Sequence, residues 1–382
     1  MPTETNAHEE TSILIAQPSE RLLGGAMLPY WSLVIPILGL LAIGLGLPSL
    51  GWVGTAAAAT IMIGCVLAAV HHAEVVAHRV GEPFGTLVLA VAVTVIEVSL
   101  IVSLMLSGGG EAATLARDTV FAAIMIILNG IVGVCLLSGG VRHREQQFVL
   151  QGVNAALCVL SAMAVLVLVL PNFTSSVPGP SYSPSQLAFT AIVSLVLYCT
   201  FVLIQTVRHR DYFLPAGAEH LPEEVHAAPP GNMQAWLAFA LLVVALIGVV
   251  LLAKQLSPTL EAAVLGAGLP LTLVGIMIAA LVLGPESLAA VKAARRNRLQ
   301  TSLNLALGSA LATIGLTIPT VAVLSIVMDW KLSLGIDAKS MTLLALSLIV
   351  SALSLGTGRT TILPGVVHIV IFLAYLFTTI VP

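Results

Sequence analysis

The strongest constraint on this chain is a succession of long apolar stretches that runs from about residue 30 to the last residues. A helix needs about 20 apolar residues to cross the hydrocarbon core of a bilayer, and eleven stretches come near that length. They are 30–47, 53–70, 84–107, 118–138, 149–170, 186–207, 235–253, 262–290, 301–328, 340–357 and 362–381. The sequence therefore predicts an all-α polytopic membrane protein with about 11 transmembrane helices.

The composition excludes the soluble classes of protein. Of 382 residues, 58% are hydrophobic and 9% are charged, whereas roughly a quarter of the residues of soluble domains are charged. Such a chain cannot cover its surface with polar groups, so soluble enzymes, nucleic-acid binders and disordered scaffolds are excluded. The four cysteines lie in apolar runs without metal-site spacing, and we interpret them as small buried hydrophobes.

The Lys and Arg residues predict the orientation. Eleven of them fall on the side that holds the N-terminus and four on the other side. Because the cytoplasmic side carries the excess of basic residues, we expect the N-terminus to be cytoplasmic and the C-terminus to lie outside. The polar, acidic first 20 residues do not resemble a cleavable signal, so the first apolar stretch is expected to remain as a membrane helix.

The longest polar interruption divides the chain into two halves. An odd number of helices in each half makes the second half enter the membrane in the opposite sense, as in the inverted repeats of secondary transporters. The predicted parts are a cytoplasmic tail (1–29), an extra first helix (30–52), a first five-helix repeat (53–207), a cytoplasmic linker (208–234) and a second five-helix repeat (235–382).

Two acidic residues lie well inside predicted helices, and each is in the second helix of its half. Glu97 follows Val93-Thr94-Val95-Ile96, and Glu286 follows Leu283-Gly284-Pro285. A charged side chain at the bilayer centre costs about 2.5–3.5 kcal/mol on insertion scales, so such residues usually serve transport. The alternative is a protonated glutamate that only hydrogen-bonds a neighbouring helix, and two matched positions make it the weaker reading.

This pair of glutamates can couple cations to protons. Burial and mutual repulsion favour the protonated forms, whereas a hard cation such as Ca²⁺ prefers oxygen ligands and displaces those protons when it binds. We expect Gly284-Pro285 to interrupt the helix just before Glu286, because proline removes a backbone hydrogen bond and broken helices at membrane depth line ion sites.

Two carboxylates cannot complete the six to eight positions around Ca²⁺, so further oxygen ligands are expected. Asn129 is predicted as a ligand rather than as a packing contact between helices. For Ser309 and Thr317 the two readings stay open, because such hydroxyls often bond their own helix backbone. The secondary candidates for the site are Thr94, Pro285, Gly308 and Thr317.

A second group of titratable residues lies outside the predicted membrane core. If the second helix continues past the membrane, its spacing brings several acids and histidines to one face, as a cation funnel or a pH sensor. An ordinary polar helix end is the simpler reading, and the acids of the linker are likewise read as solvated. The regulatory candidates are His71, Glu74, His78, Glu82, Glu223 and Glu224.

Two motifs resemble a known family. Gly81-Glu82-Pro83-Phe84-Gly85 followed by Thr94 and Glu97 resembles the first signature repeat of the calcium/proton exchangers, within the cation/calcium exchanger superfamily. Pro285-Glu286 followed by Ser302-Leu303-Asn304-Leu305-Ala306-Leu307-Gly308-Ser309-Ala310 resembles the second repeat. The chain is most similar to the bacterial calcium/sodium–proton antiporter subgroup, over nearly its whole length after residue 25.

The resemblance implies an eleven-helix secondary transporter, not an enzyme, in the bacterial inner (plasma) membrane. It implies that Glu97 and Glu286 bind the cation and the protons, with Asn129 and Ser309 as polar partners on adjacent helices. The expected substrates are Ca²⁺, Na⁺ or K⁺, and H⁺. No organic cofactor and no nucleic-acid partner are implied, the lipid bilayer surrounds the protein, and a homo-oligomer stays open.

The chain departs from the family pattern near both acids. Val93-Thr94 and Val282-Leu283 stand where many members have a Gly-Asn pair, and Ala312 stands where many have a glutamine. We therefore predict export of cytoplasmic Ca²⁺ in exchange for protons by alternating access, with a monovalent cation/proton antiporter as the alternative. A passive channel ranks lower, and an intramembrane enzyme finds no HExxH or GxSxG motif here.

Overall fold

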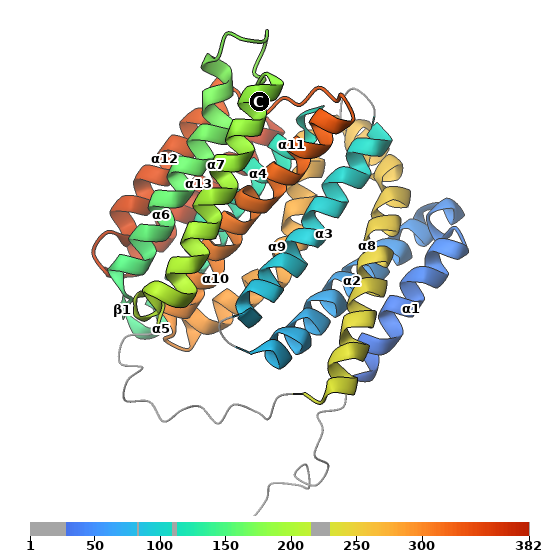
Figure 1. The fold of residues 1–382 in the computed structure, drawn as a ribbon, viewed down its shortest axis with the longest axis horizontal. Coiled ribbons are helices and arrows are strands. Elements are labelled where there is room, and N and C mark those ends of the chain that lie inside the picture. The colour runs from blue at the N-terminus through green and yellow to red at the C-terminus, as the bar shows by residue number, and fades with distance from the viewer. Residues whose placement is uncertain (1–27, 82–83, 109–112, 215–229, 382) are drawn as a thin grey trace, which may run out of the picture.

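The computed structural model describes residues 28–81, 84–108, 113–214 and 230–381, and these residues form a bundle of eleven long helices (Figure 1). Nine of them are each described by one α-helical range. Their bounds are α1 Tyr30–Gly44, α2 Gly51–Val80, α3 Phe84–Gly108, α6 Leu150–Ala164, α7 Pro184–Leu203, α8 Asn232–Gly266, α9 Thr272–Arg295, α12 Ala338–Leu355 and α13 Ile362–Ile380.

The two remaining long helices each consist of two α-helical ranges joined by a π-helical segment, and α6 and α7 each end in a π-helical segment, Val165–Val169 and Ile204–Arg208. In the first half, α4 (Leu115–Met125) continues through the π-helical Ile126–Ile131 into α5 (Val132–His143). In the second half, α10 (Leu299–Ala312) continues through the π-helical Thr313–Thr317 into α11 (Ile318–Val327). Each is the third helix of its half, counted after α1.

The predicted fold class is confirmed. Nine helices of the described residues are long and apolar enough to cross a membrane, and α1 and the core of α3 (Val91–Ser103) are shorter apolar helices. One helix is followed by two groups of five, as predicted. Because α2 is the second long helix and α8 is the seventh, they cross the bundle in opposite directions. Large apolar side chains such as Phe189, Trp236 and Leu353 are exposed on the bundle, as expected where lipid rather than water surrounds it.

Several helices are longer than their apolar stretches. The second helix was predicted at 53–70 but continues to Val80, and the seventh was predicted at 235–253 but runs to Gly266 through Pro258. The eighth helix begins at Thr272, not at 262. A helix does not have to end where the hydrocarbon ends, because its own backbone hydrogen bonds persist into the aqueous region.

The expected break at Gly284-Pro285 is wrong. α9 is a continuous helix from Thr272 to Arg295 with Pro285 inside it. Proline removes one backbone donor, but the remaining hydrogen bonds hold the helix together, and membrane helices tolerate this. Irregular backbone within the apolar spans lies instead in the π-helical segments of the third helices and in those that follow α6 and α7.

Two apolar clusters organise the bundle. The smaller one joins α1, α2, α3 and α8, which lie together at the right of Figure 1, and the larger one joins α4 to α7 and α9 to α13. The helices α3 and α9 contribute to both clusters and therefore lie at the junction. Their members in the smaller cluster include Val93, Ile96, Leu100 and Val282, and those in the larger one include Ile101, Met105, Ile276, Ala279 and Leu283.

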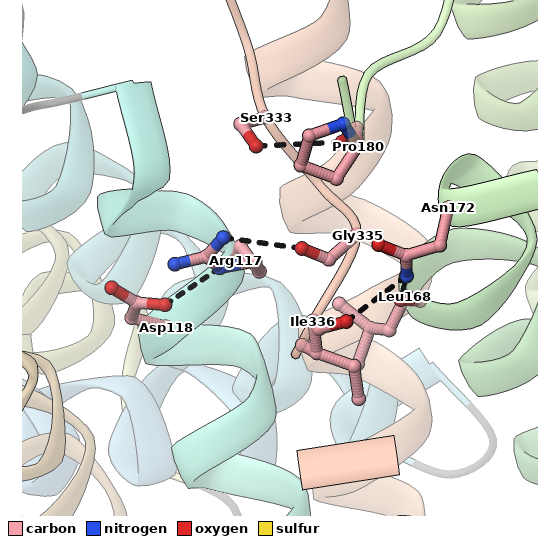
Figure 2. Close-up of polar contacts among 8 residues, drawn as sticks. All are labelled: Arg117, Asp118, Leu168, Asn172, Pro180, Ser333, Gly335 and Ile336. Atoms are coloured by element: carbon pink, nitrogen blue, oxygen red, sulfur yellow. Dashed lines mark hydrogen bonds and ion pairs between the residues drawn. The ribbon is translucent and has the colours of Figure 1, made fainter. Parts of the chain in front are cut away.

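Short contacts outside the helices tie the two halves together at both ends. At one end, β1 (Gln146–Gln147) pairs antiparallel with β2 (Arg359–Thr360), a two-residue ladder that the sequence did not predict. At the other end, Figure 2 shows Arg117 donating to Asp118 at 2.7 Å and to the Gly335 carbonyl at 3.1 Å. Asn172 donates to the carbonyl of Ile336 at 3.0 Å, so the segment before α12 is held against the first half.

The packing of α13 on α5 yields a prediction. A Cβ atom at Gly365 would lie 2.5 Å from the Leu137 backbone nitrogen and 2.9 Å from its Cα. Because backbone atoms cannot move aside easily, we expect Gly365→Ala to destabilise the protein by about 1–3 kcal/mol. Thermal unfolding in detergent measures this loss. The control is Gly44→Ala in α1, whose Cβ would meet no atom within 4 Å; an equal shift in both variants would contradict the packing argument.

Candidate ion-binding site

Glu97 lies on α3 at the junction of the two apolar clusters. Its side chain is buried, with 4% of the residue exposed. The Thr313 hydroxyl donates a hydrogen bond to Glu97 Oε2 at 2.9 Å. Its other oxygen, Oε1, is buried and finds no hydrogen-bond partner within the described part of the chain. The described part of the protein thus satisfies one oxygen of this carboxyl group and not the other.

Glu286 lies on α9, at the same junction. The residue as a whole is partly exposed, but Oε2 is buried and lacks a partner among the described residues. Ser309 on α10 is a hydrogen-bonding partner of the Glu286 side chain. The two carboxyl groups lie near enough for Glu286 to act electrostatically on Glu97. The structure therefore brings together Glu97, Glu286 and Ser309, three of the four principal residues predicted from the sequence.

The π-helical segment Thr313–Thr317 positions groups around both glutamates. A Cβ at Gly315 would lie 2.5 Å from Tyr198 Cβ, so glycine allows α7 to approach the segment closely. The Tyr198 side chain is buried and lies within electrostatic range of Glu286. A π-helical turn widens the helix locally and is frequent at functional sites.

Sequence reasoning missed Thr313 and Tyr198. Thr313 follows Ser309 by four residues, and residues four apart share a face of a helix, so the predicted role of Ser309 could have pointed to Thr313. Tyr198 lies in an ordinary apolar run of the sixth stretch, and no local pattern distinguishes it. Only its approach to Gly315 across the bundle brings it to the site.

Asn129 belongs to a different polar group. It is fully buried, and its Nδ2 donates to Ser347 Oγ at 2.8 Å. Its Oδ1 lies 3.2 Å from His368 Nδ1, and His368 Nε2 is hydrogen-bonded to Ser354 at 2.8 Å. The described polar contacts of Asn129 are thus with α12, α13 and its own helix, and none of them is with a glutamate. We name Asn129, Ser347, Ser354 and His368 the asparagine–histidine network.

The secondary candidates lie on the helices that carry the pair or Ser309, or in the π-helical segment that follows α10. Thr94 is buried one turn before Glu97, and Pro285 directly precedes Glu286. Gly308 has open space where a side chain would be, since no atom lies within 4 Å of its Cβ position. Thr317 is fully buried, and its hydroxyl lacks a partner among the described residues.

Three of the regulatory candidates lie on α2. Since α2 continues to Val80, His71, Glu74 and His78 do share one helix. The His71 ring packs 5.4 Å from the Trp31 ring, and the neighbouring His72 is hydrogen-bonded to the Ser32 carbonyl at 2.9 Å. No hydrogen bond among the described residues joins the three candidates. The others, Glu82, Glu223 and Glu224, lie outside the described residues.

The donor set defines what this site can bind. Nowhere in the described ranges do three His, Cys, Asp or Glu residues gather as a metal cluster. The groups around the junction are two carboxyl groups and the hydroxyls of Thr313 and Ser309. Carboxylate and hydroxyl oxygens suit protons and hard cations such as Na⁺, K⁺, Mg²⁺ and Ca²⁺.

Comparison with known proteins supports the resemblance predicted from the sequence. The profile described as "Sodium/calcium exchanger protein" matches residues 50–207 and 237–381. The chain is 48% identical over 361 residues to y4hA of Sinorhizobium fredii, which is named as an ionic transporter, covering 94% of this chain and 98% of that one. It is 36% identical over 319 residues to the sodium-potassium/proton antiporter ChaA of Escherichia coli, covering 83% and 86%.

Solved structures share the fold. Native YfkE superposes with a TM-score of 0.71 at 16% identity, covering 92% of this chain and all of that one. The H⁺/Ca²⁺ exchanger CAX gives a TM-score of 0.65 at 16% identity, covering 91% and 89%. At such identities the likeness concerns the fold alone, and it confirms the predicted helical membrane architecture.

The asparagine–histidine network yields a prediction. His368→Ala removes the partner of Asn129 Oδ1 and of Ser354 and leaves a cavity in a fully buried position. We expect a loss of about 2–4 kcal/mol in stability, because the cavity and the unpaired polar groups both disfavour the folded state. Thermal unfolding in detergent measures the effect. His78→Ala, at an exposed position of α2, serves as control, and matching shifts would show that the network contributes nothing specific.

Proposed function

Because this chain belongs to the sodium/calcium exchanger protein family, we propose that it is a secondary antiporter that exchanges a cytoplasmic cation for protons at Glu97 and Glu286. One observation carries the proposal. Each glutamate of the pair keeps one buried carboxyl oxygen without a partner among the described residues, and the two carboxyl groups interact. A buried carboxylate is strongly unfavourable unless a proton or a cation compensates it.

The exchange follows from this competition. A cation that binds between the two carboxylates requires both to be ionised, so its arrival expels protons. When the cation leaves, the paired carboxylates repel each other and burial disfavours their charge, so protons return. Thr313 donates to Glu97 Oε2 and therefore stabilises the ionised, cation-binding form. One site thus holds either a cation or protons, and each crossing carries one of the two.

The two apolar clusters support alternating access. The glutamates lie on α3 and α9, the helices that belong to both clusters. Movement of α1, α2 and α8 against the larger cluster would therefore uncover the pair toward one membrane surface at a time. We propose that the helices of 53–207 and of 235–382 are the two inverted repeats of this mechanism, joined by the 208–234 linker.

Ca²⁺ and monovalent cations are competing cargoes. Ca²⁺ is the first candidate, because two carboxylates supply the negative charge that a divalent ion needs. Na⁺ or K⁺ is favoured by two observations: ChaA, 36% identical, is named a sodium-potassium/proton antiporter, and the donors found at the pair are fewer than the six to eight that Ca²⁺ takes. Asn129 would have to leave Ser347 and His368 to add to them.

The proposed location is a bacterial inner membrane, with the N-terminus in the cytoplasm and the C-terminus outside. The excess of Lys and Arg on the N-terminal side supports this orientation. The bacterial relatives y4hA and ChaA support the assignment to a bacterial membrane.

Everted vesicles test the proposal directly. After a pH gradient is formed, addition of the transported cation should collapse it in the wild type, and Glu97→Gln or Glu286→Gln should abolish the collapse because a neutral amide cannot exchange protons. Ca²⁺, Na⁺ and K⁺ are added separately to identify the cargo. Glu145→Gln, at an exposed residue that pairs with Arg359, is the matched control. Unchanged flux in both glutamate variants would refute the proposal.

The Thr313 hydroxyl should set the pH range of transport. A hydrogen bond to a charged group contributes about 1.5–3 kcal/mol, and 1.36 kcal/mol corresponds to one pH unit. Thr313→Val removes a donor that favours the ionised carboxylate, so half-maximal transport should move upward by about one pH unit, whereas Thr313→Ser should behave as wild type. Thr320→Val is the control, since the Thr320 hydroxyl donates to the Leu316 carbonyl of its own helix. A downward or absent shift in Thr313→Val would contradict the assigned contact.

A further inference from the structure

A second site lies where α5 and α9 end, beside the β1–β2 ladder (Figure 1). The contacts of Figure 2 lie at the other end of the bundle. A cavity of about 630 Å³ opens there. Its lining residues are mainly basic, with two apolar side chains: Arg142, His143, Leu288, Val291, Lys292, Arg295 and Arg296. None of these residues belongs to the glutamate pair or to its hydroxyl partners.

The positive charge of this cavity is not balanced by the described carboxylates. Arg142, Lys292, Arg295 and Arg296 are all exposed side chains. The ion pairs found in the described part of the chain join Arg117 to Asp118 and Arg359 to Glu145, and neither reaches the cavity. Four cations that face one hollow repel each other, so an anion that binds between them would be stabilised.

The backbone around the cavity is fixed in place. His143 Nε2 is hydrogen-bonded to the Arg295 carbonyl at 3.1 Å. Gln146, of which 1% is exposed, donates to the Ala294 carbonyl at 2.9 Å and to Asn297 Oδ1 at 3.0 Å. These contacts hold the end of α9 against the end of α5. Because the backbone that carries the basic side chains is fixed, less conformational entropy is lost when a ligand binds.

A glycine confirms how closely this base is packed. A Cβ at Gly139 would lie 1.7 Å from Gln146 Oε1. A side chain at residue 139 would therefore displace the Gln146 amide from its place between the end of α5 and the turn that follows α9. The buried Gln146 amide and Gly139 thus hold the two basic helix ends together.

The cavity is amphipathic along α9. Leu288, Val291, Lys292 and Arg295 follow one another at spacings of three, one and three residues and therefore lie on one helix face. Leu288 is 70% exposed and lies nearest the membrane interior, whereas the cations lie at the end of the helix. An anionic group at the helix end and a hydrocarbon chain along Leu288 and Val291 would meet complementary surfaces at once.

We propose that this cavity binds the headgroup of an anionic phospholipid from the leaflet at the basic face of the bundle. Its phosphate lies among Arg142, Lys292, Arg295 and Arg296, and its acyl chains lie along Leu288 and Val291. Basic pockets between membrane helices bind anionic lipid headgroups in this way, and guanidinium groups match phosphate in geometry as well as charge. A soluble phosphate would meet the same cations but would leave the apolar wall uncovered.

The experiment measures lipid binding to the purified full chain in detergent by native mass spectrometry. Phosphatidylglycerol and phosphatidylcholine with identical acyl chains are titrated in parallel, with inorganic phosphate as a third ligand. We expect saturable binding of phosphatidylglycerol at one site, weaker binding of phosphatidylcholine, and little competition from inorganic phosphate.

Matched variants locate the site. Each basic residue near the surface contributes about fivefold in affinity, so Arg142→Gln with Arg296→Gln should weaken phosphatidylglycerol binding about 25-fold. The control removes the same charge from another exposed pair on the same face, Arg208→Gln with Arg210→Gln, and should change it less than about threefold. Far-ultraviolet circular dichroism and thermal unfolding establish that both double variants are folded.

Three results would overturn the proposal. Equal binding of the two lipids would remove the requirement for an anionic headgroup. Equal loss in both double variants would show that affinity follows net charge and not this cavity. Displacement of phosphatidylglycerol by inorganic phosphate at similar concentration would identify the ligand as a soluble anion.

Discussion

The structure depends on the free energy of placing two carboxyl groups inside an apolar bundle. Water would stabilise their charge, and lipid and packed side chains do not. The protein provides one hydroxyl donor to Glu97 and one hydroxyl partner to Glu286, which is not enough to satisfy four carboxyl oxygens. In the exchange that we propose, protons or a cation compensate the remaining oxygens in turn.

The surrounding helices determine which groups reach the two glutamates. The π-helical turn at Thr313–Thr317 brings a hydroxyl to Glu97, and Gly315 lets Tyr198 pack on this turn, within electrostatic range of Glu286. The matching turn at Ile126–Ile131 has a different use, because Asn129 within it is held by His368 and Ser347. The two halves therefore share a backbone feature at the same place in their third helices but differ in the side chains that it presents.

Much of the architecture could be predicted because hydrophobicity and charge act locally. Eleven apolar stretches predicted the eleven helices, and the cost of burying Glu97 and Glu286 singled them out without knowledge of their neighbours. Helix ends were predicted less well, since α8 continues past Lys254 and Pro258 where hydropathy alone suggests a loop. The break at Pro285 was wrong because loss of one hydrogen bond does not interrupt a helix whose other hydrogen bonds remain.

The side-chain partners needed the fold. Nothing near Asn129 in the sequence shows that His368, more than 200 residues away, holds its amide, and nothing near Tyr198 shows that it lies close to Glu286. Such contacts arise from helix packing between distant parts of the chain. The residue type is enough to identify a candidate ligand. The groups that its side chain contacts depend on how the surrounding helices pack.

Proton release on cation binding is the most direct measurement of the central claim. Purified protein in weakly buffered detergent solution, at a pH where the pair holds protons, receives the cation while a pH indicator follows free H⁺ and calorimetry follows binding. The account predicts that bound cation and released protons rise together and saturate together. Saturable cation binding with no proton release at any pH between 5 and 9 would contradict it.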